Sequence, residues 1–238
     1  MNVVTGIGWI TQREYGCLRR GVRSPYSDLR ALRTDLEGQA VFTRPVKGFG
    51  RYDRVSQMTC CVTALAFHDA GMSYGDRKQD IGILGSNAEG CLQSNLDYFK
   101  DFVSHGRTLA RANYFIYTLP SSPMAEAAIH FKCQGPLLYM RFPGKPVVSL
   151  LRHADRMILR GESSGILAIL ASEEAGQCFM VGRRDDASGE DVFEIESVID
   201  IAQKEPPLGG LIAALTDLKH DGTAGGEPRA GGSRGRRP

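Results

Sequence analysis

The chain has few of the features that mark disulfide-rich, zinc-binding or membrane-spanning proteins. Its six cysteines contain no Cys-x-x-Cys pair, which argues against a disulfide framework and against a zinc site with paired ligands. We therefore interpret them as small buried or half-buried thiols in a reducing compartment, and expect no bound metal. The cysteines are Cys17, Cys60, Cys61, Cys91, Cys133 and Cys178.

Long apolar runs and a strong charge of either sign are also lacking. Residues 1–10 begin apolar without a basic region, which is typical of a first strand and not of a signal peptide. No run approaches the roughly 18 apolar residues that span a bilayer. The net charge of +2 is too small to indicate nucleic acid or an anionic membrane as partner. We expect a soluble, cytoplasmic protein.

Three nucleotide and hydrolase motifs are incomplete or missing. Gly6-x-Gly8 is followed by Thr11 where a dinucleotide fingerprint needs a third glycine. The glycine-rich stretch 82–90 lacks the Gly-Lys-Ser/Thr of a phosphate loop, and no Gly-x-Ser-x-Gly elbow occurs. We expect no cofactor.

Hydrophobic periodicity predicts alternating strands and helices. Apolar runs indicate strands over 2–10, 80–85, 137–142 and 166–171, and helical spacing indicates helices over 56–70, 89–103, 120–131 and 147–160. A short helix is predicted over 15–21, and 22–50 reads as irregular. Such alternation is typical of a layered α/β fold.

Beyond Ser172 the pattern weakens. Strands are predicted over 179–182 and 192–201 and a short helix over 208–218. Residues 221–238 have no large apolar side chain and cluster Arg229, Arg234, Arg236 and Arg237, so we predict a disordered tail.

Several short motifs occur in the order found in one enzyme family. The opening Val3-Val4-Thr5-Gly6-Ile7-Gly8 is similar to that family's first strand, and Phe49-Gly50-Arg51 precedes a helix that ends in Asp69-Ala70-Gly71. The strand Asp80–Ser86 is followed by Pro123-Met124-Ala125 and then Gly135-Pro136. In this order the chain resembles the N-terminal half of the β-ketoacyl synthases of the thiolase-like superfamily.

The resemblance locates the family's nucleophile. That family places its cysteine eight residues after the Gly-Pro proline, and eight residues after Pro136 stands Gly144. The correspondence continues without a gap through Leu159-Arg160-Gly161 to the strand over 166–169. It implies a layered α/β fold with a mixed central sheet and three regions: a β-ketoacyl synthase-like domain over 1–171, a divergent α/β extension over 172–220, and the tail over 221–238.

A condensing enzyme needs a thiolate at this strand-to-helix turn to accept the acyl group. Gly144 offers no heteroatom, so we expect no catalytic residue at the nucleophile position. The family's C-terminal half supplies the groups for decarboxylation, and the residues after Ala171 are too few to contain it. Both points argue against condensing activity in this chain alone.

Other residues are weaker candidates for the lost nucleophile or its base. Ser149 and His153 lie opposite the apolar stripe of the 147–160 helix, beside Arg152 and Arg156, where solvated or interface side chains are expected. Cys133 precedes the strand over 137–142 and therefore lies near its wrong end.

Three functional hypotheses remain. The first is a non-condensing ketosynthase-like protein of a fatty-acid, polyketide or aryl-polyene type pathway, which pairs with a condensing enzyme or binds acyl carrier protein. In it, the strand over 137–142 pairs with a partner's strand in a homo- or heterodimer. The second is an acyltransferase of the 3-oxoacyl synthase type that is active only with a complementing subunit. The third is a structural remnant without ligand or partner.

Overall fold

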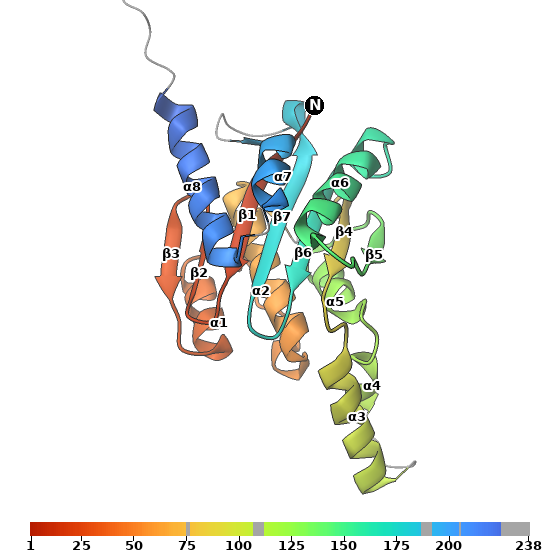
Figure 1. Ribbon diagram of the computed structural model, residues 1–238. Helices are drawn as coiled ribbons and strands as arrows, with labels where there is room; N and C mark the ends of the chain where they lie inside the picture. The colour runs from red at the N-terminus through yellow and green to blue at the C-terminus, as the bar shows by residue number, and fades with distance from the viewer. Residues whose placement is uncertain (75–76, 107–111, 187–191, 205, 225–238) are drawn as a thin grey trace, which may run out of the picture.

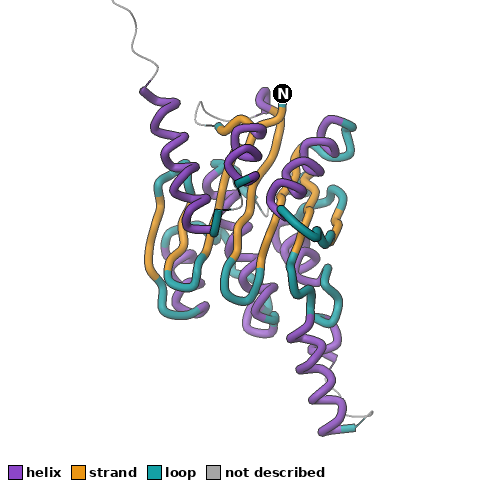
Figure 2. The backbone as a smooth tube through the Cα atoms, in the orientation of Figure 1, coloured by secondary structure: helices purple, strands orange, loops and turns teal. Residues whose placement is uncertain are grey.

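The structure is a computed structural model that describes residues 1–74, 77–106, 112–186, 192–204 and 206–224. These residues form a mixed β-sheet between two layers of helices (Figures 1 and 2). The sheet order is β3-β2-β1-β7-β6-β4-β5, with β8 paired to β1. This confirms the predicted α/β fold class with a mixed central sheet.

Five strands belong to the antiparallel part of the sheet and three to the part with parallel pairs. The first four are β1 (Asn2–Ile10), β2 (Glu14–Cys17), β3 (Val22–Pro25) and β7 (Gly176–Arg183), which pair antiparallel with one another. The fifth is the short β8 (Phe193–Glu194), which also pairs antiparallel with β1, and the other three are β4 (Ile81–Ser86), β5 (Leu137–Tyr139) and β6 (Gly165–Ala171). Strand β4 is parallel to both β5 and β6, so the carboxyl ends of these three strands lie at the same end of the sheet.

Each face of the sheet has its own apolar core. On one face pack α1 (Leu29–Gly38), α2 (Arg54–Asp69) and α5 (Ser122–Phe131). On the other pack α6 (Pro146–Leu159), α7 (Ile195–Gln203) and α8 (Leu208–Ala224). Helices α3 (Leu92–His105) and α4 (Ala112–Ile116) project beyond the end of the sheet (Figure 1). Among the described residues, none of the helices has the length and apolar composition to cross a bilayer.

The glycines of β1 let α2 lie directly on the strand. A Cβ atom on Gly8 would stand 2.6 Å from the backbone nitrogen of Ala66, and one on Gly6 would stand 2.4 Å from the Ala66 carbonyl oxygen. A bulge between Val4 and Gly6 turns the amide of Ile7 toward the buried Asp69, whose Oδ2 accepts from it at 2.8 Å. The Val-Val-Thr-Gly-Ile-Gly and Asp-Ala-Gly motifs are therefore one packing unit.

Changing Gly8 to alanine should disrupt this unit. Its Cβ would meet backbone atoms, which cannot rotate away, so we expect a loss of about 3 kcal/mol in the free energy of unfolding. The matched control is Gly182→Ala in β7, where a Cβ meets no atom of the described chain within 4 Å. Urea unfolding followed by circular dichroism measures both, and equal stabilities of the two variants would contradict this packing.

Most predicted elements are confirmed with shifts of a few residues at their ends. The predicted helix over 15–21 is wrong: this segment supplies β2 and the turn into β3, where Gly21 has φ +65°. Pairing of β2 with β1 outweighs the weak local helical pattern. Residues 22–50 are not irregular, because they also contain α1, whose first amides are capped by Asp28.

Two predictions near the C-terminus also need correction. The predicted strand over 192–201 is mostly α7, since Ile195, Val198, Ile199 and Ala202 are buried at helical spacing. The tail predicted as disordered from 221 is helical as far as Ala224, and 225–238 lie outside the described residues. Strand β7 lies between β1 and β6, so residues after Ala171 supply the middle of the sheet. The division into three regions stays a prediction.

Candidate functional site

The turn from β5 into α6 keeps the geometry of a strand-to-helix elbow. Lys145 adopts a left-handed conformation with φ +46°, and Pro146 begins α6 in the position that favours proline. Gly144 is exposed, and a Cβ atom on it would have no neighbour within 4 Å in the described chain. The turn therefore has space for a side chain that the sequence does not supply.

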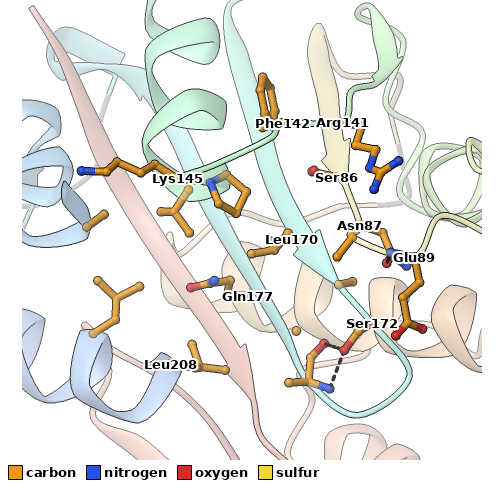
Figure 3. A pocket seen from close by; sticks show the side chains of 18 of the residues that line it. Ser86, Asn87, Glu89, Arg141, Phe142, Lys145, Leu170, Ser172, Gln177 and Leu208 are labelled. Carbon is orange, nitrogen blue, oxygen red and sulfur yellow. Dashed lines mark hydrogen bonds between the residues drawn. The ribbon is translucent and has the colours of Figure 1, made fainter. Parts of the chain in front are cut away.

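A pocket of about 480 Å³ opens beside this turn. Its walls come from the carboxyl end of β4 (86–89), the turn (141–142 and 145–147), the β6–β7 connection (170–172 and 175–177) and parts of 202–211 (Figure 3). In α/β proteins ligands bind outside the carboxyl ends of parallel strands. The position of the pocket makes it the candidate functional site.

Several polar side chains at the rim are held within their own loops. Asn87 accepts from the amide of Glu89 at 2.9 Å and donates to the carbonyl of Gly90 at 3.2 Å. Ser172 donates to the carbonyl of Ala175 at 3.1 Å and so closes the β6–β7 turn. These contacts fix the shape of the rim.

Lys145 joins the turn to the opposite wall. Its Nζ donates to the backbone carbonyl of Gln203 at 3.0 Å, at the end of α7. Because α7 and α8 belong to the region beyond Ala171, this contact ties that region to the elbow.

The other candidate residues lie away from the pocket. His153 places Nδ1 2.8 Å from the carbonyl oxygen of Ser149, and its ring centroid is 5.5 Å from that of Phe142. Ser149 and His153 both lie on the polar side of α6. Cys133 forms a β-bridge with Gln79 near the amino end of β4, at the other end of this strand from the pocket. Burial raises the pKa of its thiol to about 12. The structure brings none of these three to Gly144.

The remaining thiols are no better placed. Burial raises the pKa of Cys17 to about 12, with the nearby Asp69 adding to the shift, and burial also raises the pKa of Cys60, Cys61 and Cys178. Cys91 donates to the carbonyl of Thr118 at 2.8 Å. Of the described residues, no cysteine lines the pocket.

Sequence reasoning missed most of the pocket. The polar run Ser86-Asn87-Ala88-Glu89 directly after a buried strand was a usable signal, because it marks the carboxyl end of that strand. No such signal marked Gln177, Leu208 and Leu211, because they belong to elements after Ser172 whose apolar pattern is weak.

Comparisons with known proteins identify solved structures that share this fold. No protein-family profile and no curated protein matches the sequence. Among solved structures, the ishigamide ketosynthase/chain length factor matches with a TM-score of 0.57 and 13% identity, over 79% of this chain and 63% of that one. The fold is that of the thiolase-like ketosynthases.

Two further structures share this fold. A type II polyketide ketosynthase, solved with its acyl-carrier protein and bound to the hexaketide (AntDE:AntF), matches with a TM-score of 0.54 and 11% identity over 77% of this chain and 58% of that one. A β-ketoacyl synthase from Burkholderia phymatum STM815 matches with a TM-score of 0.50 and 14% identity over 77% and 59%. The chain therefore spans about three-fifths of the length of these ketosynthases.

Proposed function

We propose that this chain is a non-condensing ketosynthase-like protein that pairs with a condensing ketosynthase. The observation that carries the proposal is Gly144. It stands at an open strand-to-helix turn, and the order of the family-like motifs puts the family's acylated thiol at this position, where only a hydrogen atom is present. The chain thus retains the scaffold of the reaction without its nucleophile.

The free edge of the sheet supports a pairing role. Among the described residues β5 pairs only with β4, so its outer edge leaves backbone groups available to another strand. Leu138 in β5 is 44% exposed. Edge-to-edge addition of a strand from a second ketosynthase-like protein would satisfy these groups.

Helices α3 and α4 carry a second unpartnered surface. Its apolar side chains are between 44% and 65% exposed, an unusual number of large ones on a single projecting unit. We call Leu92, Leu96, Phe99, Val103, Phe115 and Ile116 the apolar face of α3–α4. This unit lies at the same side of the molecule as β5 (Figure 1). A partner paired along β5 would be placed to cover it.

Co-expression tests the pairing directly. The chain is co-expressed with a ketosynthase encoded in the same gene neighbourhood, and the complex is analysed by size-exclusion chromatography with light scattering. The expected result is a 1:1 heterodimer. A chain that remains monomeric at micromolar concentration of both proteins would contradict the proposal.

Binding of an acyl carrier protein is a second candidate role. Arg152 and Arg156 on α6 and Arg160 at its C-cap follow one another at four-residue spacing in exposed positions. They form a basic stripe that suits an acidic partner. The ketosynthase with TM-score 0.54 was solved in complex with its carrier protein. This likeness and the stripe support the role.

Reversing charges on the stripe should weaken carrier binding. We expect Arg152→Glu combined with Arg156→Glu to lower the affinity for the pathway's carrier protein at least about tenfold at low salt. Arg30→Glu combined with Arg51→Glu makes the same change in net charge at exposed positions elsewhere and should leave the affinity within about twofold. Fluorescence anisotropy measures both, and equal losses in the two variants would argue against a specific carrier surface.

A further inference from the structure

Gln177 is a polar residue in an apolar row of the sheet. It stands on β7 two positions before Phe179, on the side that faces α6, α7 and α8. Its backbone is fixed by pairing with Trp9 on β1 and Leu170 on β6. The side chain therefore cannot leave the wall of the pocket without a change in the sheet.

The side-chain amide of Gln177 makes no hydrogen bond within the described chain. The residue is 7% exposed, and its Oε1 is covered without a partner. An unpaired buried amide group carries a desolvation penalty that a bonded one does not. Figure 3 shows Gln177 among the residues that line the pocket. The pocket is thus the place from which a partner for this amide can come.

The walls around Gln177 are mostly apolar. Val147, Leu170 and Leu208 are only half-buried, although each packs against the core beneath α6–α8. Pro206 and Leu211 extend this surface toward α8. The volume of about 480 Å³ lies within the range of small-molecule sites, which are typically apolar with a few polar groups that fix orientation.

We propose that this pocket binds a neutral amide or lactam with an apolar body of about 8–12 heavy atoms. A carboxamide presents a donor and an acceptor side by side, and a second amide presents the complementary pair. For this pairing the side-chain amide of Gln177 has to turn about its terminal carbon–carbon bond so that both polar atoms face the pocket. Two hydrogen bonds then form, and the apolar body packs on Val147, Leu170 and Leu208.

The ligand class follows from the missing partners. A carboxylate lacks the donor that Oε1 needs, and an ester lacks it as well. A site built around an amide rejects analogues that leave one of its polar groups unpaired. This binding role uses other residues than the proposed pairing with a ketosynthase, because the pocket shares no residue with β5 or with the apolar face of α3–α4.

Isothermal titration of the full chain with octanamide and methyl octanoate tests the site. We expect octanamide to bind at least about tenfold more tightly than the ester. In Gln177→Leu, which replaces the side-chain amide with an apolar group of similar size, the affinity for octanamide should fall to that for the ester. The control Gln93→Leu, at an exposed position of α3, should leave both affinities unchanged.

A second variant keeps the test decisive if Gln177→Leu does not fold. Leu208→Trp fills the pocket from its half-exposed wall and should reduce the binding of both probes at least about tenfold. Equal affinity of the wild type for octanamide and methyl octanoate, no binding of octanamide up to its solubility limit, or unchanged binding in Leu208→Trp would overturn the proposal.

Discussion

Replacing Phe99 with aspartate is expected to weaken the proposed complex with a ketosynthase at least about 100-fold, equivalent to about 2.7 kcal/mol. Phe99 is 63% exposed at the centre of the apolar face of α3–α4, so in the complex it would be among the most deeply covered side chains. Aspartate there would lose that contact and would bury a charge without a partner. The monomer should be little affected, because an exposed side chain contributes within about 0.5 kcal/mol to its stability.

The control for this variant is Ser104→Asp. It adds the same charge to an exposed position of α3 outside the apolar face, and it should change the affinity by less than about twofold. Biolayer interferometry measures the affinities and thermal unfolding measures the stability of each monomer. Unchanged affinity of Phe99→Asp would show that the partner does not cover α3.

Introducing cysteine at the elbow should create a reactive thiol where the wild type has none. In Gly144→Cys the new Cβ has free space in the described chain, so the variant should fold with nearly wild-type stability. The thiol would stand just before the first turn of α6, where unpaired amides stabilise a thiolate and lower its pKa. We expect alkylation by iodoacetamide at pH 7 about ten times faster than at an unperturbed cysteine.

The matched control for the elbow is Gly38→Cys. Gly38 is also exposed with free space around it, but it lies at the end of α1, where the helix dipole disfavours an anion. Peptide mapping after timed alkylation gives both rates. A rate at position 144 no higher than at position 38 would mean that the elbow does not activate a thiol.

The part of the fold predicted best is the part with strong local patterns. The 56–70 helix and the strand over 80–85 read clearly because their apolar spacing and bounding residues agree, and α2 and β4 confirm them. The bulge that joins Ile7 to Asp69 was not visible, since it depends on contacts 62 positions apart. The β2–β3 hairpin was missed because strands this short are fixed by their neighbours and not by their own residues.

The candidate site could also be predicted only in part from the sequence. The turn over 143–146 could be predicted from its Pro-Gly-Lys-Pro sequence, and α6 begins at Pro146 as expected. The assignment of Gly144 to the nucleophile position stays a prediction. The pocket beside this turn could not be predicted, because α7 and α8 supply one of its walls. The apolar pattern of that segment is weak, and the strand predicted from it is mostly helix α7. The exposure of Leu92, Leu96, Phe99 and Val103 was equally hidden, since helical spacing of apolar residues is the same for a core face and a docking face.

The central claim is that this chain retains a ketosynthase scaffold without a nucleophile, and intact-mass spectrometry tests it most directly. The wild-type chain and Gly144→Cys are each incubated with octanoyl-coenzyme A, alone and together with the partner ketosynthase. We predict that the ketosynthase gains the mass of one acyl group and that the wild-type chain gains none, with any adduct on the variant confined to Cys at position 144. An acyl adduct on the wild-type chain would contradict the account, because another side chain would then perform the chemistry that Gly144 lacks.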